Sequence, residues 1–220
     1  MKKVIIFGNG QMAEIAHVYL EHDSTFEVVG FTVDKKYISD KTFRGLPVAA
    51  FEDIESVYSK EEYDMFIPIG AKQLNGLRAD KYFQAKEKGY GFISYISSKA
   101  IVCPETKIGD NCFIFENNVI QPFASIGDNT ILWSGNHIGH HTSIGEHCFI
   151  SSHVVISGRV RVDPYCYFGV NSTVRDGLVI KEKCIIGAGS LILKNTSEKQ
   201  VFRGKHTECF RFSSDAIKVS

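Results

Sequence analysis

The chain has 220 residues, enough for one large domain or two modest ones, and its composition is that of an ordinary globular protein. Its 25 Lys and Arg balance 25 Asp and Glu, so the chain lacks the excess of positive charge that binding to a polyanion favours. This balance argues against nucleic acid as a partner. The first apolar run is too short for a signal peptide and no stretch is long enough to cross a bilayer, so we expect a cytoplasmic protein without membrane contact.

Residues 1–97 alternate between strand-like and helix-like segments. We expect strands at 3–7, 26–32 and 65–69, helices at 11–21, 51–59 and 74–88, and an exit segment at 92–96. This alternation predicts an α/β unit with a parallel sheet, which binds ligands at the carboxyl ends of its strands.

A glycine turn follows the first expected strand. Gly8, Asn9 and Gly10 lead into a helix whose first backbone N–H groups can bind a phosphate. Asp34 follows the second strand, where a dinucleotide fold places its ribose-binding acid. These residues alone suit NAD as well as a nucleotide sugar, and an ordinary turn beside a surface aspartate also fits them.

From Val102 to Ile192, sixteen apolar residues stand at every sixth position. Neither an α-helix, with a period of 3.6, nor a single strand, with a period of 2, produces this interval. The residue two positions earlier is small in nearly every repeat, and glycine often follows the apolar residue, which suits a tight corner. The pattern predicts a solenoid with flat faces and sharp corners.

The repeat also sets expectations for cysteine and histidine. Four cysteines fall in the small inward column and are expected to fill the core: Cys112, Cys148, Cys166 and Cys184. Five of the eight histidines crowd into residues 137–153, but those six apart lie on different corners and no two are eighteen apart. We therefore expect no metal site.

The repeat closely resembles that of the left-handed parallel β-helix acyltransferases, in which three hexapeptides form one coil. With the turn at Gly8 and the segment 68–72, nearly the whole chain resembles the bacterial sugar acyltransferases. That family comprises sialic acid O-acetyltransferase-like proteins and N-acetyltransferases of nucleotide-linked 4-amino-4,6-dideoxysugars. The resemblance implies a Rossmann-like nucleotide-sugar-binding domain over 1–97, a left-handed β-helix over 98–194, a C-terminal cap over 195–220, and a homotrimer.

The resemblance also implies site residues. Residues 135–145 match the family's catalytic stretch and select His140 as general base, with His141 as the second candidate because many relatives have aspartate there. A neutral imidazole can accept the proton of a sugar ammonium group, although a solvated corner histidine is the alternative. Relatives often carry an acid beside this histidine, but the chain has Gly139, which leaves open which carboxylate orients His140.

Two further groups of residues follow from the resemblance. Those expected to bind the nucleotide sugar are Gly8, Asn9, Gly10, Asp34, Gly70 and Lys72. Those expected to bind acetyl-CoA are Gly158, Val170, Ala188, Arg203 and Lys205. The family's usual Gly-x-Pro-Ala turn reads Gly-Lys-His-Thr at 204–207, so the end of the coenzyme site is altered.

We therefore expect an acetyl-CoA-dependent N-acetyltransferase that modifies the amino group, at C4, of a nucleotide-linked amino-dideoxysugar by direct attack. One alternative is an O-acetyltransferase of the sialic acid type. The other is a non-catalytic nucleotide-sugar-binding protein whose coenzyme site has decayed. The sequence does not distinguish UDP, GDP and dTDP carriers.

Overall fold

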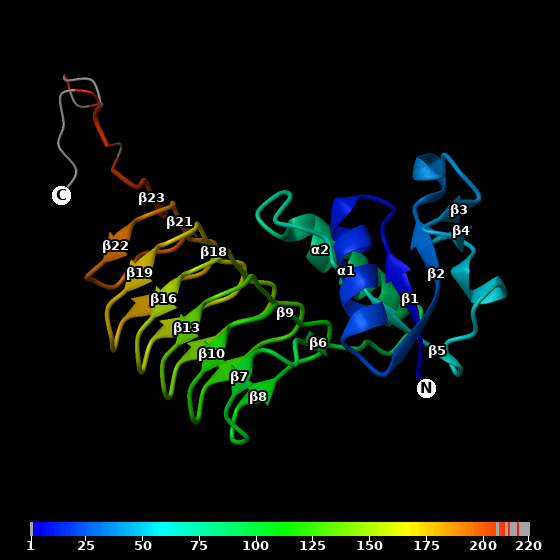
Figure 1. The fold of residues 1–220 in the computed structure, drawn as a ribbon, viewed down its shortest axis with the longest axis horizontal. Coiled ribbons are helices and arrows are strands. Elements are labelled where there is room, and N and C mark those ends of the chain that lie inside the picture. The colour runs from blue at the N-terminus through cyan, green and yellow to red at the C-terminus, as the bar shows by residue number, and fades with distance from the viewer. Residues whose placement is uncertain (1, 206, 210, 212–214, 216–220) are drawn as a thin grey trace.

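The computed structural model describes residues 2–205, 207–209, 211 and 215, and its first half forms one sheet (Figure 1). In this sheet β1 (Lys2–Phe7), β2 (Phe26–Val33), β4 (Leu46–Ala50) and β5 (Tyr63–Phe66) run parallel, in the order β4-β2-β1-β5. The edge strand β3 (Thr42–Phe43) is antiparallel to β4. The predicted parallel α/β sheet is confirmed.

The two long helices cover opposite faces of this sheet. Along β1, Val4 and Ile6 pack with α1 (Gln11–His22), whereas Ile5 and Phe7 pack on the side of α2 (Gly76–Glu87). Successive side chains of a strand point to opposite faces, so one apolar run supports both helices. A short helical turn, η1 (Lys35–Tyr37), follows β2.

The helix predicted at 51–59 is wrong. The segment holds only the short turn η2 (Ile54–Ser56), and the Phe51 N–H donates to the Val33 carbonyl at 2.8 Å beside the sheet. A nine-residue segment is marginal as a helix without strong tertiary packing. The preceding hairpin was not predicted, because its turn places Arg44 and Gly45 at φ 53° and 80°, positions that Asn-Gly usually marks.

Two other boundaries differ from the prediction. The strand expected at 65–69 is β5, which begins and ends earlier, at Tyr63 and Phe66. The second helix begins at Gly76 rather than at residue 74, since Gln73, Leu74 and Asn75 have φ values of 54°, 50° and 67°. Positive φ is incompatible with a right-handed helix, so these residues form a turn before α2.

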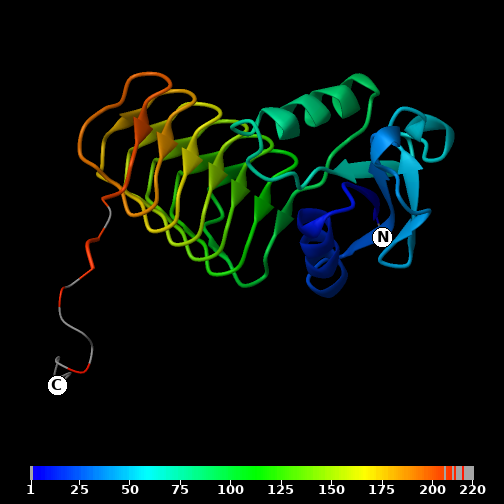
Figure 2. The same cartoon turned by 90° about the horizontal axis from the view of Figure 1, so that it is seen from above.

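The second half is a parallel β-helix of three flat faces with two-residue strands (Figure 1, Figure 2). The β7 face contains β7 (Ile101–Val102), β10 (Val119–Ile120), β13 (His137–Ile138), β16 (Val155–Ile156), β19 (Thr173–Val174) and β22 (Leu191–Ile192). The β8 face contains β8 (Lys107–Ile108), β11 (Ser125–Ile126), β14 (Ser143–Ile144), β17 (Arg161–Val162) and β20 (Val179–Ile180). The β6 face contains β6 (Tyr95–Ile96), β9 (Phe113–Ile114), β12 (Ile131–Leu132), β15 (Phe149–Ile150), β18 (Tyr167–Phe168), β21 (Ile185–Ile186) and β23 (Val201–Phe202).

The pairing follows the predicted eighteen-residue coil. Ile120, Ile138 and Ile156 stack in register, and the inward residues from Ile114 to Ile192 are buried in one core. The four cysteines assigned to the inward column lie in this core, as predicted. Repeat, strand pairing and coil length match the predicted hexapeptide β-helix, and β6 already belongs to it.

The three faces differ in what covers them. On the β6 face, Phe113, Ile131 and Phe149 are buried in a cluster with residues of α1. On the β7 face, Ile101 and Leu191 are 67% and 62% exposed. The corner between the β7 and β8 faces is therefore the one that lies opposite the first half of the chain.

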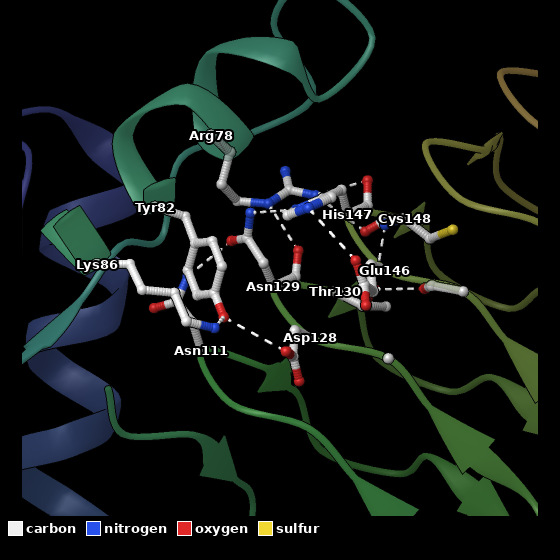
Figure 3. A network of polar contacts seen from close by, with 12 residues as sticks. Arg78, Tyr82, Lys86, Asn111, Asp128, Asn129, Thr130, Glu146, His147 and Cys148 are labelled. Atoms are coloured by element: carbon white, nitrogen blue, oxygen red, sulfur yellow. Dashed lines mark hydrogen bonds and ion pairs between the residues drawn. The ribbon is translucent and has the colours of Figure 1, made fainter. Parts of the chain in front are cut away.

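A buried arginine joins the two halves (Figure 3). Arg78 of α2 is 0% exposed and points to the corner between the β8 and β6 faces. Its guanidinium donates to backbone carbonyls of both halves and to one amide side chain: Ile69, Gly70, Asn129, His147, Cys148 and the side chain of Asn75. Burial lowers the pKa of Arg78 to about 10, which leaves it charged at neutral pH.

A polar ladder runs along the same corner. The Ile67 N–H donates to Asn111 Oδ1 at 2.8 Å, and Asn111 Nδ2 donates to Asn129 Oδ1 at 2.7 Å. Asn129 Nδ2 in turn lies 2.7 Å from His147 Nδ1. Because an amide nitrogen only donates, His147 Nδ1 accepts and the imidazole is neutral.

Replacing Arg78 by Met should lower the free energy of unfolding by roughly 3–5 kcal/mol, because buried carbonyls then lose their donor. Urea-induced unfolding measures the change. The matched control is Glu87→Gln on the same helix, an exposed position where we expect a change within about 0.5 kcal/mol. Equal, small effects of the two substitutions would contradict the assignment of Arg78 as the junction.

The ladder also predicts a pH dependence. Burial, followed by the charge of Arg78, lowers the pKa of His147 from 6.5 to about 4. The unfolded chain then binds this proton more tightly than the folded chain. The stabilisation is complete above about pH 6.5 and is lost as the pH falls to about 4, by roughly 3 kcal/mol. His147→Asn places the same residue as Asn111 and Asn129 at an equivalent left-handed position, and it should remove this pH dependence. The measurement is the free energy of unfolding of the wild type and the variant between about pH 4 and pH 6.5. If this free energy changes equally with pH in both proteins, the assignment to His147 is wrong.

Candidate functional site

The predicted glycine turn lies at the carboxyl end of β1. Gly8 has φ 126°, and its N–H donates to the Thr32 carbonyl at 2.8 Å. Gly10 caps α1 without a side-chain hydrogen bond, which leaves the first N–H groups of the helix available. Asn9 Nδ2 donates to the Tyr37 carbonyl at 3.1 Å. The turn therefore presents backbone donors and a helix N-terminus, as a phosphate site requires.

Asp34 does not stand alone at the end of β2. Its Oδ1 lies 2.5 Å from Nζ of Lys81, a residue of α2 that is 9% exposed. Sequence reasoning missed Lys81, since a lysine on a helix gives no signal of its own. The pair borders a cavity of about 570 Å³ that is also lined by Lys36, Phe51, Glu52, Gln84, Glu87 and Lys88. The cavity offers side chains of both charges to a polar ligand.

Gly70 and Lys72 lie in the turn between β5 and α2. The Gly70 carbonyl accepts a hydrogen bond from Arg78 at 3.2 Å, and Lys72 is exposed. A Cβ at Gly70 would lie 4.0 Å from Cγ of Met12, in the first turn of α1. The two predicted glycine segments are thus neighbours at one edge of the sheet, and Asp34 follows the adjacent strand.

His140 and His141 lie at the corner between the β7 and β8 faces, between β13 and β14, and both are exposed. Their Nδ1 atoms are 3.1 Å apart. The His140 N–H donates to Oε1 of Gln121 at 2.9 Å, which fixes the backbone of the corner. In the described part of the chain, the side chain at hydrogen-bonding distance from the His140 ring is thus an imidazole and not a carboxylate.

The neighbouring coils complete this corner. A Cβ at Gly158 would lie 2.7 Å from Nε2 of His140, so any larger residue would displace the ring from its present position. The ring of Phe123 lies 4.8 Å from that of His141. Gln121, Phe123 and Gly158 were not predicted to border the histidines. The eighteen-residue stacking rule finds two of them, because Gly158 lies one coil from His140 and Phe123 one coil from His141.

Four of the five residues predicted to bind coenzyme share another corner, between the β6 and β7 faces. Val170 and Ala188 are eighteen residues apart and exposed, and the Gly189 N–H donates to the Val170 carbonyl at 2.8 Å. Arg203 and Lys205 extend this edge after β23 and are also exposed. Gly158 instead belongs to the histidine corner. His206 of the altered turn lies outside the described residues.

Two further findings concern the described residues alone. Within them, no three His, Cys, Asp or Glu side chains are grouped as a metal ion would require. Of the histidines from 137 to 153, His137 lies in strand β13 and the others lie at corners, with His147 in the polar ladder and His140 beside His141. No helix in the described part of the chain is long and apolar enough to span a membrane.

In a single chain, the phosphate-type turn and His140 lie on opposite sides of the solenoid. The first half buries Phe113, Ile131 and Phe149 of the β6 face, and His140 occupies the corner between the other two faces. A reaction that needs both groups cannot be completed within one chain in this arrangement.

Comparison with known proteins places the repeat and the fold. The protein-family model described as "Bacterial transferase hexapeptide (six repeats)" matches residues 105–140 and 123–158. The model described as "Hexapeptide repeat of succinyl-transferase" matches residues 164–194. No curated protein sequence matches the chain.

Several solved structures share the fold along nearly the whole chain. A histidine-to-asparagine variant of perosamine N-acetyltransferase from Caulobacter crescentus, in complex with CoA and GDP-perosamine, is 21% identical with a TM-score of 0.82, covering 92% of this chain and 93% of that one. The acetyltransferase domain of PglB from Neisseria gonorrhoeae is 21% identical with a TM-score of 0.80, covering 93% and 97%. WeeI from Acinetobacter baumannii AYE is 18% identical with a TM-score of 0.76, covering 91% and 96%. The chain thus carries the hexapeptide repeat of bacterial transferases on a two-part fold that it shares with these proteins.

Proposed function

We propose that this chain is an acetyl-CoA-dependent N-acetyltransferase that acts on the amino group of a nucleotide-linked amino sugar, at C4 of a dideoxysugar. The observation that carries the proposal is the histidine pair at a hexapeptide corner, in a chain with a glycine turn for a diphosphate. Structures with the same fold are described with CoA and GDP-perosamine, which supports both substrate classes.

Acetyl transfer requires the protein to position the amine next to the thioester and to supply one general base. The sugar amine attacks the thioester carbonyl carbon while Nε2 of His140 accepts a proton from the amine nitrogen. The tetrahedral oxyanion is steadied by a backbone N–H at a neighbouring corner. When the C–S bond breaks, the coenzyme leaves as a thiolate and takes up a proton to become a thiol. Burial raises the pKa of Cys112 to about 12, so this core cysteine is unsuited to a covalent acyl-enzyme.

The first half is proposed to act as a Rossmann-like nucleotide-sugar-binding domain. Gly8, Asn9 and Gly10 bind the diphosphate through backbone N–H groups, with Gly70 and Lys72 beside them. The cavity at Asp34 and Lys81 receives the base or the ribose. The charged and polar side chains that line the cavity support this assignment.

The active unit is proposed to be a homotrimer. Ile101 and Leu191 on the β7 face are exposed, whereas Phe113, Ile131 and Phe149 on the β6 face are already covered by the first half. His140 and the glycine turn lie on opposite sides of one chain, so a site that needs both must combine two copies. Acetyl-CoA lies between copies, along Val170, Ala188, Arg203 and Lys205 of one and the corner at Gly158 of the other.

His140→Gln should lower kcat for an amino-sugar substrate by roughly 10²–10⁴-fold, because glutamine cannot accept the proton. The KM for acetyl-CoA should change little, since Val170, Ala188, Arg203 and Lys205, which hold most of the coenzyme in this proposal, are unaltered. Steady-state kinetics with nucleotide-linked amino sugars and their hydroxyl counterparts measures both values. Near-normal turnover by a folded variant would refute the base, and preference for the hydroxyl acceptor would indicate O-acetylation.

Mixed trimers test the shared site. Gly10→Asp keeps a good helix cap in open space but places a negative charge where the diphosphate binds. Neither this variant nor His140→Gln should be active alone. Co-expressed in equal amounts and assembled at random, they should regain about a quarter of wild-type activity, because that share of sites combines an intact turn with an intact histidine. If every site lies within one chain, the mixture stays inactive.

A further inference from the structure

The side chain at hydrogen-bonding distance from the His140 ring is that of His141, an imidazole that can itself bind a proton. We propose that His141 is a positioning residue whose neutral imidazole accepts the Nδ1–H of His140, so that one bound proton anywhere on the pair switches the base off. The inference rests on the proposed function of His140 as general base. It assigns to His141 a role that a carboxylate in the same place would perform differently.

The geometry fixes both rings. One hydrogen bond joins His140 Nδ1 to His141 Nδ1 at 3.1 Å, so a single proton lies between them. When His140 donates it, its Nε2 is left with a lone pair, and Nε2 is the atom that lies over Gly158. His141 has φ 58°, and its ring packs on Phe123, which directs Nδ1 back toward His140.

A proton added to the pair always ends on Nε2 of His140. If His140 gains it directly, Nε2 becomes N–H. If His141 is protonated, both of its nitrogens donate, and His140 Nδ1 must accept. The remaining proton of His140 then lies on Nε2. Both routes give the same hydrogen-bonded cation, in which the base is blocked.

The surroundings add little net charge to the pair. The residues packed directly above and below are Gln121, Pro122 and Phe123 on one side and Ser157, Gly158 and Arg159 on the other. Of these only Arg159 is charged, and its side chain lies 3.3 Å from Asp176. Farther along the same corner stand Glu105, which accepts from Cys103, and Arg175.

Three substitutions of His141 separate the roles. Asparagine and aspartate both accept a hydrogen bond and tolerate positive φ, as Asn129 does at an equivalent corner position, whereas alanine offers no acceptor. We expect His141→Ala to lower kcat about 10–100-fold with KM values unchanged. His141→Asn should restore kcat to within a few-fold of wild type, which distinguishes lost positioning from misfolding.

The pH profile of kcat/KM supplies a readout that a structural role would not move. In the wild type the acid limb should steepen from first to second order, because the pair takes up two protons. His141→Asn should give a first-order limb throughout. His141→Asp should also give a first-order limb, moved to higher pH by about one unit, since a carboxylate favours the imidazolium of His140. A first-order wild-type limb, or a second-order limb in the asparagine variant, would overturn the proposal.

Nuclear magnetic resonance tests the pair without any substrate. In protein labelled with ¹⁵N-histidine, neutral His140 should carry its proton on Nδ1, and His141→Ala should move it to Nε2. His141→Asn should keep it on Nδ1. An Nε2–H tautomer in the wild type contradicts the inference even if acetyl transfer is found. The predicted tautomer without acetyl transfer would instead count against the proposed function alone.

Discussion

The buried guanidinium of Arg78 is the contact on which the arrangement of this molecule depends. A charge removed from water is costly unless every donor is satisfied. Arg78 meets this demand with carbonyls from both halves and without a carboxylate. Because the acceptors are backbone groups at fixed positions, they hold α2 in one place against the solenoid. The turn from Gly70 to Asn75, with its three residues at positive φ, is part of the same arrangement.

The solenoid is the part of the fold that the sequence predicts best. Its interval of six couples each inward residue to neighbours eighteen positions away, so one short pattern specifies a long structure. The same rule placed the cysteines in the core and separated the histidines. In the first half, β1, α1 and β2 follow ordinary periodicity. The hairpin at Arg44 and the turn before α2 depend on positive φ at residue types that rarely adopt it. Tertiary contacts determine these two conformations, so the local sequence does not predict them.

The candidate site was predicted unevenly for similar reasons. Gly8, Gly10 and Asp34 are visible because their positions at strand ends have a known meaning. Lys81 became visible only when α2 was seen beside β2, a contact between residues far apart in the chain. Which carboxylate, if any, orients His140 was left open by the sequence, and the ring at hydrogen-bonding distance is that of the next residue, His141. Local geometry at a left-handed corner turns the two rings toward each other, and side-chain type alone does not reveal it.

Arg78 also sets a level along the axis of the solenoid. Three of its acceptors, at Asn129, His147 and Cys148, belong to the turn built from β12, β13 and β14, and His140 lies between β13 and β14. Arg78 and the start of α2 are therefore held level with the coil of the histidine pair, in a structure whose coils are spaced about 4.8 Å apart. In a trimer whose axis is parallel to the solenoid, rotation changes direction but not height, so Arg78 of each copy lies level with His140 of the next copy.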